Sequence, residues 1–244
     1  MKRTPRLATI ATTTLTAVAL TVSMSACSSG SDDAADQGSD QGVTADAGTD
    51  ATAEDTDAGD AEASSAPTVP DGYSLTEVPD ADLAIAIPSD WTTLTGDDVA
   101  DAERVAAMAT ALNTTEDDAR SRLEMLSLYS IDMNEDSSGY GETLNVQMLA
   151  EPNLPSEDQL TGMIEAQSTT EVTLDAGDYS TVTTGSGADA IMQVYDLVYA
   201  DGSSIPSAYL VLPTADGSQT AYVAISTTSA ERTQELADVI LSSV

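Results

Sequence analysis

The stretch Ile191-Met-Gln-Val-Tyr-Asp-Leu-Val-Tyr199, the turn pair Asp201-Gly202 and the run Ala208-Tyr-Leu-Val-Leu212 follow one another in the second half of the chain. Asp-Gly between apolar runs is the strongest short-range signal of a β-hairpin, because glycine readily adopts the positive φ that tight hairpin turns require. A second pair, Asp216-Gly217, leads into another apolar run at Ala221 to Thr227. The sequence therefore predicts antiparallel strands joined by short turns.

The residues around this hairpin region predict the other elements of one domain that spans residues 67–244. Apolar or alternating runs predict further strands at Tyr73 to Thr76, Leu83 to Ile87, Ser127 to Met133, Thr143 to Leu149, Glu171 to Leu174 and Tyr179 to Thr184. Apolar residues at helical spacing and N-terminal capping sequences predict four helices, which begin near Asp97, Thr115, Ser156 and Thr228. Hairpin-joined strands with helices before, between and after them indicate the α+β class, an antiparallel β-sheet with helices packed on its faces.

In the segment Ile85-Ala-Ile-Pro88-Ser-Asp-Trp91, the predicted strand runs into Pro88, which breaks it ahead of Trp91, the only tryptophan of the chain. This Pro-x-x-Trp sequence, followed by helices, a run of hairpins and a final amphipathic helix, resembles the PsbP-like fold as used by actinobacterial LpqN/LpqT lipoproteins. The resemblance covers residues 73–244 as a pattern of elements and implies a curved antiparallel sheet between helices. It also implies a binding or accessory protein of the cell envelope, and it supplies no catalytic residues.

The sequence Met24-Ser-Ala-Cys27 ends an apolar stretch that follows Lys2, Arg3 and Arg6. A basic start, an apolar run and small residues before a cleavage point are typical of a secretory signal peptide. The four residues resemble the lipobox of bacterial lipoproteins, in which an aliphatic residue usually stands in the place of Met24. The resemblance implies cleavage after residue 26 and acylation, as by palmitate, of Cys27, the only cysteine. The protein would then be anchored at the outer face of the cell membrane. The alternative is ordinary secretion, which would leave a free thiol.

Residues 28–66 consist almost wholly of Ser, Asp, Ala, Gly, Thr and Glu. Such a segment cannot bury an apolar core, so residues 27–66 are predicted to be a lipidated cysteine followed by a disordered acidic tether. The whole chain carries 42 acidic and seven basic residues, a net charge of −35. Nucleic acid is excluded as a partner, because a phosphate backbone binds clustered lysine and arginine.

Catalytic and cofactor-binding residues are not predicted anywhere in the chain. It contains no histidine, and its one thiol is Cys27, so neither a Ser-His-Asp triad nor a Cys-His pair can form. The stretch from Asp132 to Thr143 has oxygen ligands at the first, third and fifth positions of a calcium loop. Ser137 and Thr143 replace the glycine and glutamate that such a loop requires. We therefore interpret this stretch as an acidic hairpin tip and predict no metal site.

These observations predict a lipid-anchored envelope protein that binds a partner and does not transform it. The first hypothesis is an accessory lipoprotein that contacts neutral glycolipids or the envelope lipid-transport machinery. The second is a protein-interaction scaffold without a small-molecule ligand, and a hydrolytic enzyme ranks third. An apolar pocket between helix and sheet would favour the first hypothesis, and a solid surface the second. Trp91 is expected in the core, as are the methionines that replace the absent phenylalanines, at positions 108, 125, 133, 148, 163 and 192.

Overall fold

The computed structural model describes residues 69–134 and 141–244. The predicted signal peptide, the lipid attachment site Cys27 and the tether lie outside these described residues, as does most of the acidic hairpin tip. No helix in the described ranges is long and apolar enough to cross a membrane.

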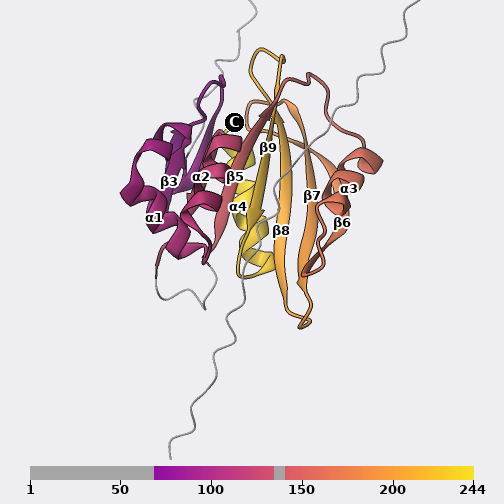
Figure 1. Cartoon of the computed structure of the whole chain (residues 1–244). Helices are drawn as coiled ribbons and strands as arrows, with labels where there is room; N and C mark the ends of the chain where they lie inside the picture. The colour runs from indigo at the N-terminus through magenta and orange to yellow at the C-terminus, as the bar shows by residue number, and fades with distance from the viewer. Residues whose placement is uncertain (1–68, 135–140) are drawn as a thin grey trace, which may run out of the picture. The chain divides into compact units, whose positions relative to one another are not determined.

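A seven-stranded antiparallel sheet forms the centre of the described part (Figure 1). Its strand order is β3-β4-β5-β9-β8-β7-β6. The strands are β3 (Thr92–Thr95), β4 (Leu128–Ile131), β5 (Thr143–Leu149), β6 (Val172–Thr183), β7 (Asp189–Tyr199), β8 (Ser204–Pro213) and β9 (Thr220–Ser226). Both predicted Asp-Gly turns are present, with φ of 85° at Gly202 and 66° at Gly217. The predicted α+β class is confirmed.

Helix α4 (Ala230–Ser242) and a separate hairpin of β1 (Tyr73–Glu77) and β2 (Ala84–Pro88) cover one face of the sheet. The core on this face contains Leu128, Val146, Val223 and Leu210, which are successive cross-strand partners from β4 to β8. Trp91 lies in the same core with 8% of its surface exposed, as predicted. The end of α4 is joined to the hairpin by a hydrogen bond from the Ala86 N–H to Ser243 Oγ, at 3.0 Å.

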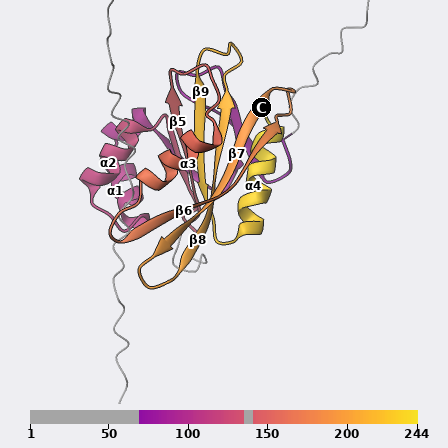
Figure 2. The same ribbon diagram turned by 90° about the vertical axis from the view of Figure 1, so that its right-hand side faces the viewer.

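Three helices cover the opposite face, as the two views together show (Figures 1 and 2). Helix α3 (Glu157–Ala166) packs on a core from β6 to β9, which includes the stacked rings of Tyr195 and Tyr209. Helices α1 (Ala102–Ala111) and α2 (Glu116–Met125) pack on β3 and β4. Each face of the sheet therefore has a packed apolar core.

The predicted helix starts are confirmed at two helices and need correction at two. Ser156 and Gln159 form a complete capping box at α3, and Thr115 caps α2. The first helix begins later than predicted, because residues 96–100 form a 3₁₀ turn and Asp101 caps α1. Ser229, one residue after the predicted Thr228, caps α4.

Two other predictions differ from the structure, and one strand is absent from the predictions. Ala176-Gly177-Asp178 is a β-bulge inside the continuous strand β6 and does not form a turn between two strands. Strand β3 was not predicted, because four residues of sequence Thr-Thr-Leu-Thr are too short to show alternation. Met125 is 41% exposed and lies outside the core, whereas Met108 and Met192 are buried and the other three methionines pack against the cores.

Candidate functional site

A cavity of about 280 Å³ lies where the start of α4 meets strands β6, β7 and β8. Its apolar lining comes from Ala176, Val194, Pro206 and Ala230. Asp175, Asp196, Thr233 and Gln234 are among its polar lining residues. We call it the α4 cavity.

The β-bulge shapes the strand side of the α4 cavity. The register between β6 and β7 shifts between Ala176 and Tyr179, and this shift brings the backbone of Gly177 close to Val194. A Cβ atom at Gly177 would lie 3.0 Å from Val194 Cγ2 and 3.3 Å from the Val194 carbonyl oxygen. A larger residue would require Val194 to shift by a few tenths of an ångström, so the close approach of the two strands favours glycine at this point. In the sequence, the same glycine stands between two predicted strands and therefore resembles a turn residue.

Two carboxylates face each other across the strands that line the α4 cavity. Asp175 of β6 pairs directly with Asp196 of β7 in the antiparallel register. Like charges at directly opposed positions of an antiparallel pair destabilise the sheet. Neither carboxylate has a hydrogen-bond or ion-pair partner among residues 69–134 and 141–244, and no arginine lines the cavity.

The other polar side chains around the α4 cavity are already engaged within the protein. Thr233 Oγ1 lies 2.8 Å from Thr227 Oγ1 and 3.2 Å from the Pro206 carbonyl oxygen, to which it donates. Ser207 Oγ lies 2.9 Å from Ser226 Oγ. The amide nitrogen of Gln234 donates to Asp238 at 2.8 Å. The acceptors that remain for a ligand are therefore chiefly those of the two aspartates.

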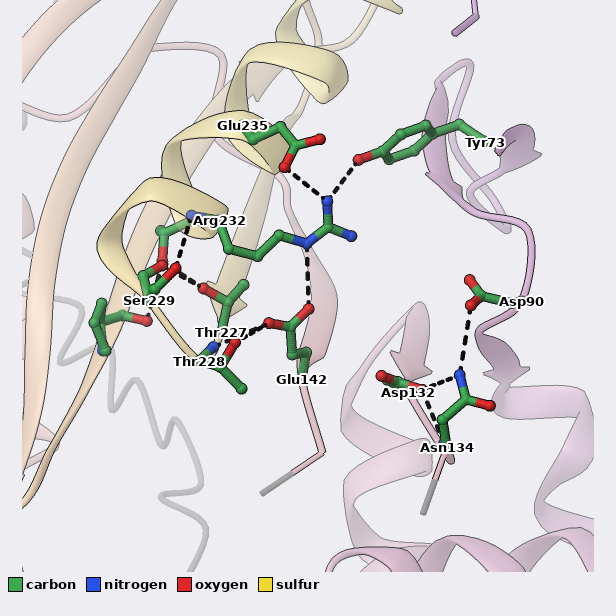
Figure 3. Close-up of polar contacts among 12 residues, drawn as sticks. Tyr73, Asp90, Asp132, Asn134, Glu142, Thr227, Thr228, Ser229, Arg232 and Glu235 are labelled. Atoms are coloured by element: carbon green, nitrogen blue, oxygen red, sulfur yellow. Dashed lines mark hydrogen bonds and ion pairs between the residues drawn. The ribbon is translucent and has the colours of Figure 1, made fainter. Parts of the chain in front are cut away.

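A second polar group lies beside the start of α4 and is fully connected (Figure 3). Glu142 accepts hydrogen bonds from the Thr228 N–H at 3.0 Å and the Thr228 hydroxyl at 2.7 Å, and its other oxygen lies 3.3 Å from Arg232 Nε. Arg232 also donates to the Tyr73 hydroxyl and to Glu235, each at 3.0 Å. We call these five residues the Glu142 cluster. It ties the start of α4 to β1 and to the beginning of β5.

Burial and hydrogen bonding act in opposite directions on Arg232. Partial burial disfavours the charged guanidinium, but the hydrogen bonds to Glu235, Tyr73 and Glu142 outweigh this effect and raise the pKa of Arg232 above its ordinary value. The Glu142 side chain is only 10% exposed, and it accepts hydrogen bonds from Thr228 and Arg232. We interpret the Glu142 cluster as a structural connection. It also explains the capping correction, because Thr228 binds Glu142 and Ser229 takes the capping position.

The structure describes only some of the residues that the sequence offers as candidate sites. Cys27 and residues 135–140 lie outside the described ranges. Asp132 Oδ1 accepts hydrogen bonds from the backbone N–H and the side-chain amide of Asn134, at 2.9 and 2.7 Å. Within the described ranges, no group of three or more acidic, histidine or cysteine side chains is placed to hold a metal ion.

No family model matches the sequence, and no curated protein matches it. Among solved structures, cyanobacterial PsbP from Synechocystis sp. PCC 6803 is similar, with 11% identity, a TM-score of 0.46, and coverage of 70% of this chain and 91% of that chain. The Ran-binding protein Mog1p of Saccharomyces cerevisiae is also similar, with 9% identity, a TM-score of 0.37, and coverage of 72% and 87%. The protein thus has a PsbP structure among its structural neighbours.

Proposed function

We propose that this chain is an exported, lipid-anchored accessory protein of the cell envelope whose α+β domain is a protein-interaction module. The signal-like leader, the lipobox resemblance at Cys27 and the acidic segment after it support the anchored, extracytoplasmic placement. The resemblance to LpqN/LpqT lipoproteins supports an accessory role. The domain is proposed to bind its partner without catalysis.

The observation that carries this proposal is the contrast between the packed cores and the small α4 cavity. The side chains between α4 and the sheet are buried, with Leu210, Val223 and Leu236 at 0% exposure. The cavity, at about 280 Å³, falls just below the range of roughly 300–1,000 Å³ that is usual for sites of drug-sized ligands. It also carries two carboxylates, which an acyl chain would have to desolvate. The cavity therefore suits the end of one side chain of a partner better than the tails of a glycolipid.

A hydrolytic role has less support from the same site. The general acid of a glycosidase is usually held protonated by apolar surroundings. Asp175 and Asp196 are both exposed, so neither has that environment. The pair is better suited to attracting a positive charge than to donating a proton.

Photo-crosslinking in intact cells tests whether the partner is a protein. A photoreactive amino acid at position 234 would stand at the α4 cavity, and one at the exposed position 110 on α1 would serve as the control. We expect discrete protein adducts of fixed mass from position 234 and none of that mass from position 110. Adducts of lipid mass at position 234 would favour the glycolipid hypothesis, and the absence of specific adducts would contradict an interaction at this site.

Cell fractionation tests the anchor separately. If acyl chains on Cys27 hold the protein, Cys27→Ser should move most of it from the membrane fraction to the soluble fraction or the medium, because two or three acyl chains anchor firmly. A variant with Ser25→Ala, which keeps both the cysteine and a small residue, serves as the control and should remain in the membrane fraction. Unchanged partitioning of Cys27→Ser would contradict lipid anchoring.

A further inference from the structure

We propose that the α4 cavity is the docking site for an arginine side chain of the partner protein. This inference rests on the proposed function and specifies the chemistry that the interaction module recognises.

The two carboxylates supply the charge that an arginine requires. Asp175 and Asp196 are direct cross-strand neighbours, and such neighbours have Cβ atoms about 4.5–5.5 Å apart. A guanidinium group carries five N–H donors in a planar fork, which allows it to bind carboxylate oxygens on two sides at once. One arginine between the two aspartates would replace their mutual repulsion with two charge-assisted hydrogen-bonded contacts.

The walls of the α4 cavity suit the apolar stem of the same side chain. Val194, Pro206, Ala176 and Ala230 present apolar surface beside the two aspartates. Arginine buries its methylene groups along such surface while its charged end reaches polar partners. A metal ion would use the carboxylates but would leave this apolar surface without a function. The lining thus favours an organic cation that carries a stem.

Among residues 69–134 and 141–244, no cationic side chain lines this position. Arg232 is adjacent in sequence to the cavity residue Thr233, but its donors are directed to Glu142, Glu235 and Tyr73. The lining hydroxyls and the Gln234 amide are bonded within the protein. The net charge of −35 would steer basic partners toward the domain, and the α4 cavity would then select the position at which one arginine enters.

Titration of the purified protein with N-acetyl-arginine amide tests the inference. We expect weak, saturable binding, with shifted amide resonances near Val194 and Ala230. The neutral isostere N-acetyl-citrulline amide should bind at least tenfold more weakly, because it keeps the shape and loses the charge. Asp175→Asn and Asp196→Asn should each weaken arginine binding at least fivefold. The matched control Asp189→Asn removes an exposed acid from the far end of β7 and should change binding less than twofold.

Three results would overturn the inference. Absence of saturable binding would exclude an arginine site, and equal binding of the citrulline probe would indicate a neutral polar site. Equal weakening by Asp189→Asn would show that net charge, and not the cavity, attracts the probe. In each case, discrete protein adducts from position 234 would still support the proposal that the domain is a protein-interaction module. Adducts of lipid mass at that position would contradict that proposal. The two failures are therefore distinguishable.

Discussion

The Glu142 cluster and the α4 cavity both lie beside the first turns of α4, but their acidic side chains differ in burial and in hydrogen bonding. Glu142 is nearly buried and receives donors from Thr228 and Arg232. Asp175 and Asp196 are exposed, oppose each other and have no partner among residues 69–134 and 141–244. An acid that holds the fold together is thus provided with donors by the chain, and the two that lack them are available to a ligand.

The expected energies of the two regions differ in sign as well as in size. Hydrogen bonds to charged groups contribute about 1.5–3 kcal/mol to stability. A favourable cross-strand pair contributes roughly 0.2–1 kcal/mol, and directly opposed like charges destabilise the sheet; we expect a cost of the same order. The first region should therefore stabilise the folded domain, and the second should destabilise it until a cation binds.

Removal of the cation from the Glu142 cluster should give the largest effect. In Arg232→Met the stem can still pack, but the nearly buried Glu142 loses its positive partner. We expect the free energy of unfolding to fall by about 2–3 kcal/mol. Urea denaturation monitored by tryptophan fluorescence would measure this change through the buried Trp91.

Arg120→Met is the matched control for this experiment. It removes the 3.4 Å ion pair with Asp117, whose side chain is 98% exposed. Exposed pairs of this kind contribute about 0.2–1 kcal/mol, so the control should cost less than Arg232→Met. Equal losses in the two variants would show that the Glu142 cluster has no special structural role.

The elements that can be predicted from the sequence are those whose signal is local. The Asp-Gly pairs at residues 201–202 and 216–217 predicted both turns, because glycine meets the positive φ there without steric cost. The capping box of Ser156 and Gln159 is likewise set within four residues. Local backbone requirements of this kind can be read directly from the residues that meet them.

The candidate site could not be predicted in the same way, because it depends on register and on distant contacts. Asp175 and Asp196 become neighbours only through the pairing of β6 with β7, which includes the bulge at Gly177. Glu142 and Arg232 are 90 residues apart in the chain. A net charge of −35 favours cationic partners in general, but it offers no means of separating these two aspartates from the other acids.

A double-mutant cycle between Asp175→Asn and Asp196→Asn tests most directly the claim that the two acids oppose each other and are retained for a ligand. The free energy of unfolding is measured at low salt for the original protein, both single variants and the double variant. The cycle cancels the contacts that each carboxylate makes separately with its surroundings. We predict a repulsive coupling of about 0.2–1 kcal/mol, which disappears when saturating N-acetyl-arginine amide is added. A coupling of zero, or an attractive one, in the absence of the probe would contradict the account.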